Sequence, residues 1–367
     1  MARKIRVGIL FGGKSAEHEV SLQSAKNIVE AIDQEKYEVA LIAIDKKGQW
    51  YLADTSRFLL HEDNPKLIKL STLRNCVALV PGEKTGHLVG LGSLKYAESI
   101  DVVFPVLHGP LGEDGTVQGL LKLANVPFVG AGVLGSAVGM DKDVAKRLLR
   151  EAGIPIARFL VFHRSSVDKL DFNRVKKQLG TPLFIKPANL GSSVGISKVK
   201  NKKQFDAALS NAFKYDNKIL IEEYIEGREI ECSVLGNEDP IVSLPGEILP
   251  NDEFYSYQAK YIDEDGALLD IPAKLSEDNK REIQRCAVET FKVLCCEGMA
   301  RVDLFLKKDD EVVVNEINTI PGFTKISMYP KLWEISGISY SDLIDKLIQL
   351  ALERFDKEQK LNTVVDL

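Results

Sequence analysis

The chain has 367 residues, enough for two or three domains, and its hydrophobic fraction of 45% supports folded cores. With 48 basic and 53 acidic residues its net charge is -5, so neither nucleic acid nor an anionic membrane surface is expected as a partner. Five cysteines without CxxC spacing and no secretory leader predict a reduced, cytoplasmic protein, and the longest charge-free run, 123–140, holds a proline and four glycines, which disfavours a membrane span.

The first 150 residues have the periodicity of an open parallel α/β domain. Two apolar runs flank a stripe of apolar residues at helical spacing, which makes a βαβ unit. The expected elements are strands at 5–10, 37–44, 101–107 and 127–129 and helices at 22–32, 115–124 and 141–151, while 50–100 has no clear assignment.

Beyond a helix stop at Gly153 and Pro155, the pattern changes to short strands that look antiparallel, so we place a domain boundary near residue 140. We expect three domains, covering 1–139, 140–231 and 232–367. The expected elements are strands at 159–162, 183–186, 192–199, 219–224 and 229–235 and helices at 168–179, 280–294 and 340–355, the last with a core-facing apolar stripe.

Two apolar runs in ARVDLFLKKDDEVVVNEINTIPGFT, residues 300–324, predict a β-hairpin with acids where a core strand would carry valine. A four-residue loop at 308–311 would place Asp303 opposite Glu316 and Arg301 opposite Asn318, all on one face. Carboxylate and amide oxygens are suited to Mg²⁺ beside nucleotide phosphates, and Arg301 could stabilise anionic charge there. The alternative is acids that only solvate one face, but unpaired charge is costly to bury between such apolar runs.

A glycine- and serine-rich loop, KPANLGSSVG, follows the strand at 183–186. Its N–H groups and hydroxyls suit phosphate binding, with Lys186 as a point charge at the strand end. It is not a Walker A loop, because GK[ST] is missing, and taken alone it fits a hairpin tip better. The segment IEEYIEGRE, 221–229, fits a hinge that offers backbone groups to adenine and Glu229 to a ribose, or equally a solvated connector.

The run GAGVLG at 130–135 matches the GxGxxG of dinucleotide-binding folds. The strand before it is only a few residues long, and no acid follows about 20 residues on to bind a ribose, so we interpret the run as a tight helix entry. Two other loops, GGKSAEHEVS at 12–21 and HGPLGEDG at 108–115, follow strands of the parallel sheet. They lie at the carboxyl edge where such sheets bind ligands, and should face one cleft.

Taken together, these motifs closely resemble those of the D-alanine–D-alanine ligases of bacterial cell-wall synthesis, members of the ATP-grasp superfamily. The resemblance spans nearly the whole chain. The matching motifs are GGKSAEHEVS, HGPLGEDG, MDK at 140–142, KPANLGSSVG, EEYIEGREIE, EFYSYQAKY at 253–261, RVD, and NEINTIPGFT with the following Ser327 and Met328. The resemblance implies an α/β ATP-grasp fold, in which an N-terminal open parallel α/β domain precedes two α+β domains that grip ATP between antiparallel sheets.

The resemblance also implies roles for particular residues toward ATP and metal. Lys142 and Lys186 would hold the phosphates, and the loop 191–195, with Ser193, would close over them. The adenine pocket would be lined by Glu222, Glu223 and Ile225, and the ribose would contact Glu229. Two Mg²⁺ (or Mn²⁺) would be held by Asp303, Glu316 and Asn318.

The implied reaction is ATP-dependent, ADP-forming ligation of two D-alanines to D-alanyl-D-alanine for peptidoglycan precursors, through a D-alanyl phosphate. The oxyanions would be stabilised by Lys260, Arg301 and the Gly322 backbone. Glu17 would bind the first ammonium, His108 would lie near that substrate, and Ser327 and Met328 would receive the second D-alanine. A set made of Glu17, Ser192 and Tyr261 would order a lid, which keeps water from the acylphosphate.

Tyr261 favours dipeptide over ester synthesis, since relatives that make D-alanyl-D-lactate usually lack a tyrosine there. The alternatives are another ATP-grasp carboxylate–amine ligase, for example a D-alanine–D-lactate ligase, and a non-catalytic nucleotide-binding module. The resemblance further implies D-alanine and ATP as small-molecule partners, and a homodimer formed through the N-terminal domain.

Overall fold

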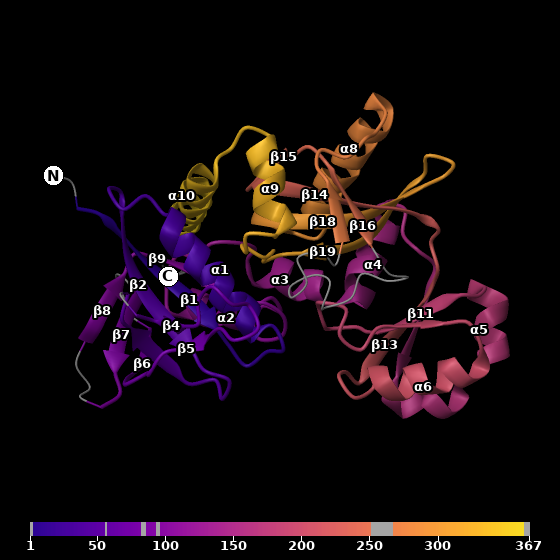
Figure 1. The fold of residues 1–367 in the computed structure, drawn as a ribbon, viewed down its shortest axis with the longest axis horizontal. Helices are drawn as coiled ribbons and strands as arrows, with labels where there is room; N and C mark the ends of the chain where they lie inside the picture. Colours follow the sequence, from indigo (N-terminus) through magenta and orange to yellow (C-terminus); the bar gives the residue numbers. More distant parts are fainter. Residues whose placement is uncertain (1–2, 56, 82–85, 93–95, 251–266, 363–367) are drawn as a thin grey trace.

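The structure is a computed structural model that describes residues 3–55, 57–81, 86–92, 96–250 and 267–362. Three large β-sheets organise these residues. Figure 1 shows the N-terminal sheet on the left, a smaller sheet at the lower right, and a third sheet above and between them. Within the described ranges, no helix is both long and apolar enough to cross a membrane.

The N-terminal sheet is built around three apolar parallel strands. β1 (Ile5–Gly12) pairs with β2 (Tyr37–Ile44) on one side and with β9 (Val102–Val106) on the other. The connection from β1 to β2 contains α1 (His18–Ala31), which confirms the predicted βαβ unit.

Residues 50–100, which the sequence left unassigned, widen this sheet with antiparallel strands, so that it is mixed and not purely parallel. The sheet order is β8-β7-β6-β3-β2-β1-β9. The added strands are β3 (Trp50–Ala53), β6 (Asn75–Val80), β7 (Gly86–Gly90) and β8 (Tyr96–Ile100), with a separate pair β4 (Leu59–Leu60) and β5 (Lys69–Leu70).

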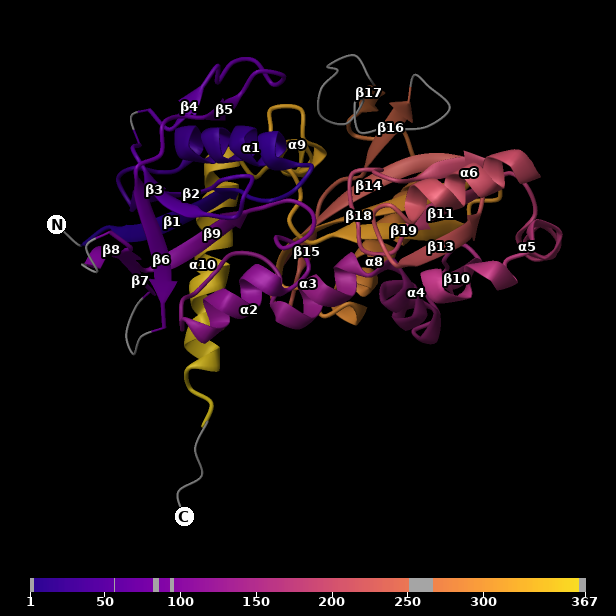
Figure 2. The same ribbon diagram turned by 90° about the horizontal axis from the view of Figure 1, so that it is seen from below.

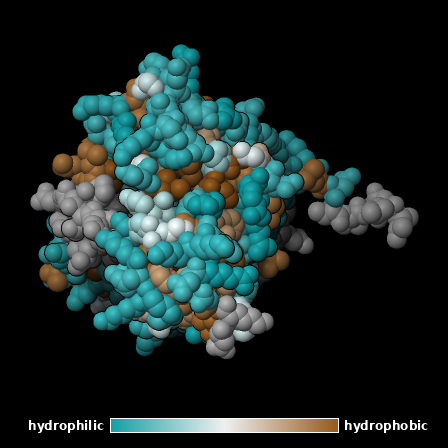
Figure 3. Space-filling model, turned by 90° about the vertical axis from the view of Figure 1, so that its right-hand side faces the viewer, coloured by the Kyte–Doolittle hydropathy of each residue, from teal (hydrophilic) through white to brown (hydrophobic). Residues whose placement is uncertain are grey.

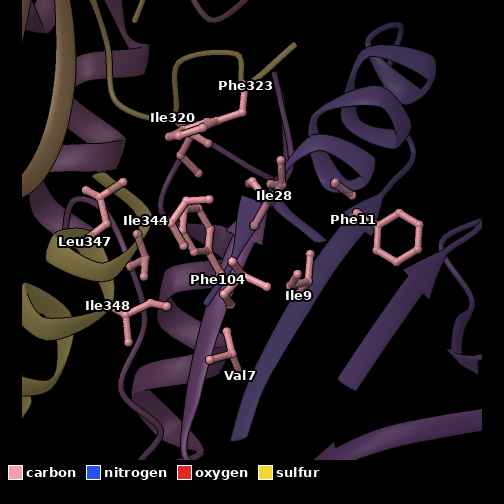
Figure 4. Close-up of a cluster of buried hydrophobic side chains, with 14 of the residues drawn as sticks. Val7, Ile9, Phe11, Ile28, Phe104, Ile320, Phe323, Ile344, Leu347 and Ile348 are labelled. Carbon is pink, nitrogen blue, oxygen red and sulfur yellow. The ribbon is translucent and has the colours of Figure 1, made fainter. Parts of the chain in front are cut away.

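Both faces of the parallel strands are covered. Val7, Ile9 and Phe11 point to a core shared with α1 and with α10 (Tyr340–Glu358), whereas Leu10 belongs to the core under α2 (Thr116–Leu123). Figure 4 shows the first of these cores, where Ile344, Leu347 and Ile348 of α10 approach Phe104 of β9. The predicted apolar stripe of the last helix therefore packs on the N-terminal sheet. Figure 2 shows, from below, how α10 runs beside this sheet.

Helices α3 (Val133–Met140) and α4 (Lys142–Glu151) lead from this sheet to the next. The predicted strand at 127–129 is reduced to a single bridge between Val103 and Phe128. Asp141 caps α4, since its side chain accepts hydrogen bonds from the N–H groups of Asp143 and Val144. This cap fixes the first helical residue, Lys142.

The second sheet is antiparallel, in the order β10-β13-β11-β12. Its strands are β10 (Phe159–His163), β11 (Leu183–Pro187), β12 (Ser197–Val199) and β13 (Lys218–Glu223). The helix expected at 168–179 is divided into a 3-10 helix (Arg164–Lys169) and α5 (Phe172–Leu179), because Asp171 caps a new helix start. Together with α6 (Lys202–Ala212), α5 covers the apolar face of this sheet. Figure 3 views this end of the molecule, whose surface is mainly hydrophilic.

The third sheet is also antiparallel, in the order β17-β16-β14-β18-β19, with β15 beside β14. Its strands are β14 (Gly227–Gly236), β15 (Ile241–Val242), β16 (Gly246–Pro250), β17 (Ala267–Asp270), β18 (Gly298–Lys307) and β19 (Val312–Asn318). One face is covered by α8 (Glu277–Val293), which buries Ile283 and Phe291. Near the end of the chain, α9 (Met328–Ile335) packs on β14.

Candidate active site

The hairpin β18–β19 has the predicted pairing at its acids but not at its turn. Asp303 pairs with Glu316 and Arg301 with Asn318, as expected. The predicted loop 308–311 agrees with the strand ends at Lys307 and Val312, but the predicted register beside it is wrong, because Leu306 and not Lys307 pairs with Val312. The Lys307 N–H bonds to the Glu311 carbonyl. A β-bulge between the pairs of Asp303 and Leu304 inserts the extra residue Asn315 and restores the register.

Both facing acids of this hairpin, Asp303 and Glu316, already have a cationic partner. The Arg301 guanidinium donates two hydrogen bonds to Asp303, both of 2.7 Å, and Asn318 Nδ2 lies 3.1 Å from the same carboxylate. Lys142 Nζ is 3.4 Å from Glu316 Oε2. Two carboxylates and an amide oxygen on one face form a hard donor set, and both carboxylates are largely hidden from water, so the residues fit a divalent cation. Among the described residues, no three His, Cys, Asp or Glu side chains gather into a metal site.

A buried charge cluster lies between α4 and the second sheet. Glu222 accepts from Lys186 Nζ at 2.5 Å and lies 3.2 Å from Lys146 Nζ, with all three side chains at most 8% exposed. Burial raises the pKa of Glu222, but the two lysines outweigh it and lower that pKa overall. Burial lowers the pKa of Lys146. Sequence reasoning missed Lys146, although its position one helical turn after Lys142 was a usable signal.

Lys186 also joins this cluster to the hairpin, since its Nζ lies 3.5 Å from Asn315 Oδ1, the residue added by the bulge. The neighbouring acid, Glu223, points elsewhere. Its carboxylate accepts hydrogen bonds from the backbone N–H of Arg158, at 2.7 Å, and from the Nε of the same arginine, at 2.6 Å. Strand alternation separates Glu222 from Glu223, so the structure does not bring the Glu223 carboxylate to the cluster. Ile225 lies in the turn after β13, and Glu229 lies on β14 opposite Phe305.

The glycine- and serine-rich loop crosses from the second sheet to the N-terminal residues. The strand expected at 192–199 begins only at Ser197, and Ser192 and Ser193 have positive φ angles of 54° and 60°. Lys142 Nζ donates to the Leu190 carbonyl at 2.7 Å, and the Ser192 hydroxyl donates to Glu17 Oε1. One short loop therefore contacts both the lysine beside the hairpin acid and a carboxylate of the first loop.

Glu17 is buried by close backbone approaches. A Cβ at Gly109 would lie 2.6 Å from Glu17 Oε2, so a larger residue at this position, where φ is 76°, would displace the carboxylate. Glu113, which sequence reasoning did not single out within HGPLGEDG, lies in the same region. Burial and then the charge of Glu17 raise the pKa of Glu113 to about 8. Its carboxylate accepts from the N–H groups of Gly109, at 2.7 Å, and Ile320, at 3.1 Å.

His108 is held by two partners and does not present a free ring nitrogen. Nδ1 lies 3.0 Å from the Ile320 carbonyl and Nε2 lies 3.3 Å from Ser24 Oγ, which in turn accepts from the Phe323 N–H at 3.1 Å. Burial lowers the pKa of His108 to about 4. With Glu113, these side chains fix the backbone of 320–323, so the structure places His108 as a support for the loop that carries Gly322.

The remaining predicted residues occupy three situations. Ser327 accepts from the Thr324 N–H at 2.9 Å, and a Cβ at Gly322 would lie 2.7 Å from Ser327 Oγ, so this turn is closely packed. Met328 begins α9 and is buried with Ile248 and Leu332. Lys260 and Tyr261, with the motif at 253–261, lie outside the described residues.

The run GAGVLG is a tight helix entry, as predicted, since α3 begins directly after Gly132, and its glycines also allow close packing. A Cβ at Gly135 would lie 2.3 Å from the carbonyl oxygen of Cys295, at the turn between α8 and β18. The backbone of Gly130 also lies close to Gly298, since a Cβ at Gly298 would be 3.1 Å from the Gly130 nitrogen. These contacts join α3 to the third sheet and explain the spacing without a nucleotide.

Comparisons with known proteins give one consistent result. The family models described as D-ala D-ala ligase N-terminus and D-ala D-ala ligase C-terminus match residues 6–131 and 148–349. The chain is 60% identical over 365 residues to the D-alanine--D-alanine ligase of Shouchella clausii, covering 100% of this chain and 99% of that protein. Two solved structures are also similar. The D-alanine-D-alanine ligase of Coxiella burnetii has a TM-score of 0.83 and 40% identity, and the match covers 98% of this chain and 97% of that one. The D-Ala:D-Ser ligase of Enterococcus faecalis has a TM-score of 0.82 and 36% identity, and the match covers 95% of this chain and 100% of that one.

Proposed function

The chain belongs to the D-alanine–D-alanine ligase family, and from this we propose that it joins two D-alanine molecules into D-alanyl-D-alanine at the expense of ATP, for peptidoglycan precursor synthesis. The observation that carries the proposal is the loop 190–192. It contacts Lys142, which lies beside the hairpin acid Glu316, and also Glu17, a buried carboxylate that could receive a substrate ammonium. One loop thus links a phosphate-binding region to an amino-acid pocket.

ATP would lie between the second and third sheets. We assign its phosphates to Lys142, Lys186 and the loop with Ser193, its adenine to the surroundings of Glu222 and Ile225, and its ribose to Glu229. For Glu223 only the backbone is a candidate contact, because Arg158 holds the carboxylate. Asp303, Glu316 and Asn318 would hold two Mg²⁺ (or Mn²⁺), which when bound neutralise and polarise the phosphoryl oxygens.

The reaction has two steps. A carboxylate oxygen of the first D-alanine attacks the γ-phosphorus of ATP, which forms D-alanyl phosphate and releases ADP. The amine of the second D-alanine then attacks the acyl carbon, phosphate leaves with the C–O electron pair, and the ammonium proton is lost. Arg301, Lys260 and the Gly322 N–H would stabilise the oxyanions, with on the order of 3 kcal/mol for each well-placed donor.

Buried surroundings suit this chemistry, because an acylphosphate hydrolyses if water enters. The bond from Ser192 to Glu17 supports the assignment of 191–195 as part of a lid, in which Tyr261 would be the third member. Ser327 and Met328 are assigned to the second D-alanine, with Met328 contributing apolar packing. His108 would act on the substrate indirectly, through the backbone of Ile320.

A homodimer formed through the N-terminal residues and a cytoplasmic location remain further proposals. The location is supported by the five free cysteines, which suit a reducing compartment. The domain limits 1–139, 140–231 and 232–367 are likewise proposed, with the qualification that α10 packs on the N-terminal sheet.

The test is phosphate release by the full chain with ATP, Mg²⁺ and D-alanine, with the product identified by mass. Parallel reactions contain L-alanine, D-alanine plus D-lactate, or D-alanine plus D-serine. Release only with D-alanine, giving D-alanyl-D-alanine as the main product in each mixture, is expected. If D-lactate or D-serine were the preferred second substrate at neutral pH, the specificity of the second site would be reassigned. If no mixture gave phosphate release, ligation of D-alanine would be contradicted.

A further inference from the structure

Glu231 is a buried acid beside the proposed metal hairpin. It is the last residue of the EEYIEGREIE motif, but none of the roles assigned above involves it. It lies on β14, where it pairs with Asp303 of β18, while Ser233 of β14 pairs with Arg301. Directly paired residues of neighbouring strands point to the same face, so Glu231 shares a face with Arg301 and Asp303. Its side chain is only 5% exposed.

Arg301 lies between two carboxylates. Its Nε is 2.9 Å from Glu231 Oε2 and 2.7 Å from Asp303 Oδ1, and its Nη2 is 2.7 Å from Asp303 Oδ2. Two buried carboxylates on adjacent strands would repel each other without this guanidinium, and a buried guanidinium is costly without an anionic partner. The three side chains therefore form a unit in which the arginine can favour one carboxylate or the other.

We propose that Glu231 is a positioning residue for Arg301, which holds the guanidinium in the site when Asp303 turns its oxygens to a divalent cation. This inference rests on the metal assignment of the proposed function. A cation at Asp303 requires the carboxylate oxygens that Arg301 now occupies. When the cation replaces Arg301 at the Asp303 carboxylate, Glu231 keeps its charged contact with Arg301. The arginine therefore stays paired and aimed at the phosphoryl oxygens.

The direct test is Glu231→Gln, which keeps the length of the side chain and an oxygen acceptor but removes the charge. Mn²⁺ binding to the full chain, with a non-hydrolysable ATP analogue present, is measured by calorimetry or electron paramagnetic resonance. We expect the Kd for Mn²⁺ to rise roughly 10- to 100-fold, the usual effect of losing an outer-shell partner. The reason is that Arg301 then depends more on Asp303 and competes with the metal. The kcat should fall by a similar factor, with a smaller change in the KM for D-alanine.

The matched control is Glu247→Gln. Glu247 also forms an ion pair with an arginine of the same sheet, at 2.6 Å from Arg228, and its side chain is 8% exposed. It pairs with Ile230, so it points to the opposite face from Glu231. This variant should change thermal stability as much as Glu231→Gln does, but leave Mn²⁺ binding at the wild-type value.

A double variant separates positioning from direct metal ligation. In an Arg301→Met background, Glu231→Gln should have no further effect on the Kd for Mn²⁺, because the arginine through which Glu231 acts is gone. A persisting effect would make Glu231 a metal ligand and overturn the proposal, as would an unchanged Kd in Glu231→Gln alone or an equal effect of Glu247→Gln. Because metal binding is measured without turnover, an outcome for Glu231 stands even if the wild-type chain forms no dipeptide.

Discussion

Ser192 donates a hydrogen bond to Glu17, and so joins two loops that are 175 positions apart in the chain. The serine has a positive φ of 54°, and both side chains are buried. A non-glycine residue in this conformation is held by its surroundings, which here include the carboxylate itself. The contact holds the loop proposed to bind phosphate against the pocket proposed for the first D-alanine.

Removal of this contact should loosen the loop. We expect Ser192→Ala to lower kcat/KM for D-alanine by roughly 100-fold, because small misplacements of reacting groups are costly. A double-mutant cycle with Glu17→Gln should give a coupling energy of about 0.5–3 kcal/mol. The exposed Ser210, on α6, offers the control Ser210→Ala, which should keep wild-type kinetics. Additive effects of the two site variants would contradict the proposed role of the bond.

The hairpin acids should be required for metal binding. Glu316→Gln is expected to weaken Mn²⁺ binding and lower kcat by more than roughly 100-fold, since outer-shell partners alone cost 10- to 100-fold. The control is Glu311→Gln at the tip of the same hairpin, where the acid is about half exposed. Calorimetric titration of both variants with Mn²⁺ and an ATP analogue decides the matter, and equal affinities would remove the hairpin from the metal site.

The buried charge cluster predicts that two substitutions destabilise the fold to very different degrees. Lys146→Met leaves Lys186 paired with Glu222, so the free energy of unfolding should change by only about 0–1 kcal/mol. Glu222→Gln leaves two buried lysines without their carboxylate, and should destabilise by about 3–5 kcal/mol. Urea unfolding of both variants measures the difference. If Lys146→Met were the more damaging change, Glu222 would not be the anion that holds the cluster together.

Gly135 should resist substitution for a steric reason. Its Cβ would lie 2.3 Å from the Cys295 carbonyl oxygen, so Gly135→Ala should destabilise by about 1–3 kcal/mol. Gly119 in α2 has no atom within 4 Å of its Cβ position, and Gly119→Ala should stabilise by about 0.4–1 kcal/mol. Thermal unfolding distinguishes the two. A tolerated alanine at 135, together with NAD binding by the wild-type chain, would revive the dinucleotide interpretation of GAGVLG.

His108 should make stability depend on pH in the acid range. Burial lowers its pKa to about 4 from the ordinary 6.5, so between these values the unfolded chain binds the proton and the folded chain does not. Its contribution is therefore full above pH 6.5 and is lost as the pH falls toward 4, by roughly 2 kcal/mol at pH 5. Denaturant unfolding at pH 5 and pH 7.5 should show a smaller difference for His108→Gln than for the wild type. Exposed His163→Gln is the control, and identical slopes for His108→Gln and the wild type would contradict the assignment.

Local patterns predicted much of this molecule. The βαβ opening followed from apolar runs and a helical stripe, and the facing of Asp303 with Glu316 followed from strand alternation. The tight helix entry at 130–135 was also predicted, and it is confirmed by the positive φ of Gly130 and by the start of α3 directly after Gly132. These features depend on residues close together in the chain, where periodicity and turn geometry leave few options.

The turn of the proposed metal hairpin shows where such reasoning fails. The predicted register beside the loop was off by one residue, and the acids still face each other only because the bulge at Asn315 corrects it. The division of the helix expected at 168–179 and the late start of the strand at Ser197 are similar cases. The residues at which helices and strands begin and end depend on single caps and bulges. The surrounding structure decides whether such a cap or bulge is energetically favourable.

The sequence by itself determined the chemical inventory: hard oxygen ligands on one hairpin, a loop suited to phosphates, and acids at the edge of a parallel sheet. Only the tertiary structure decided which charges meet. It paired Lys146 with Glu222 and Glu231 with Arg301, turned His108 and Glu113 to the backbone of Ile320, and laid α10 on the N-terminal sheet. The reason is physical: buried charges and apolar faces must find partners, and those partners are set by packing between segments far apart in the chain.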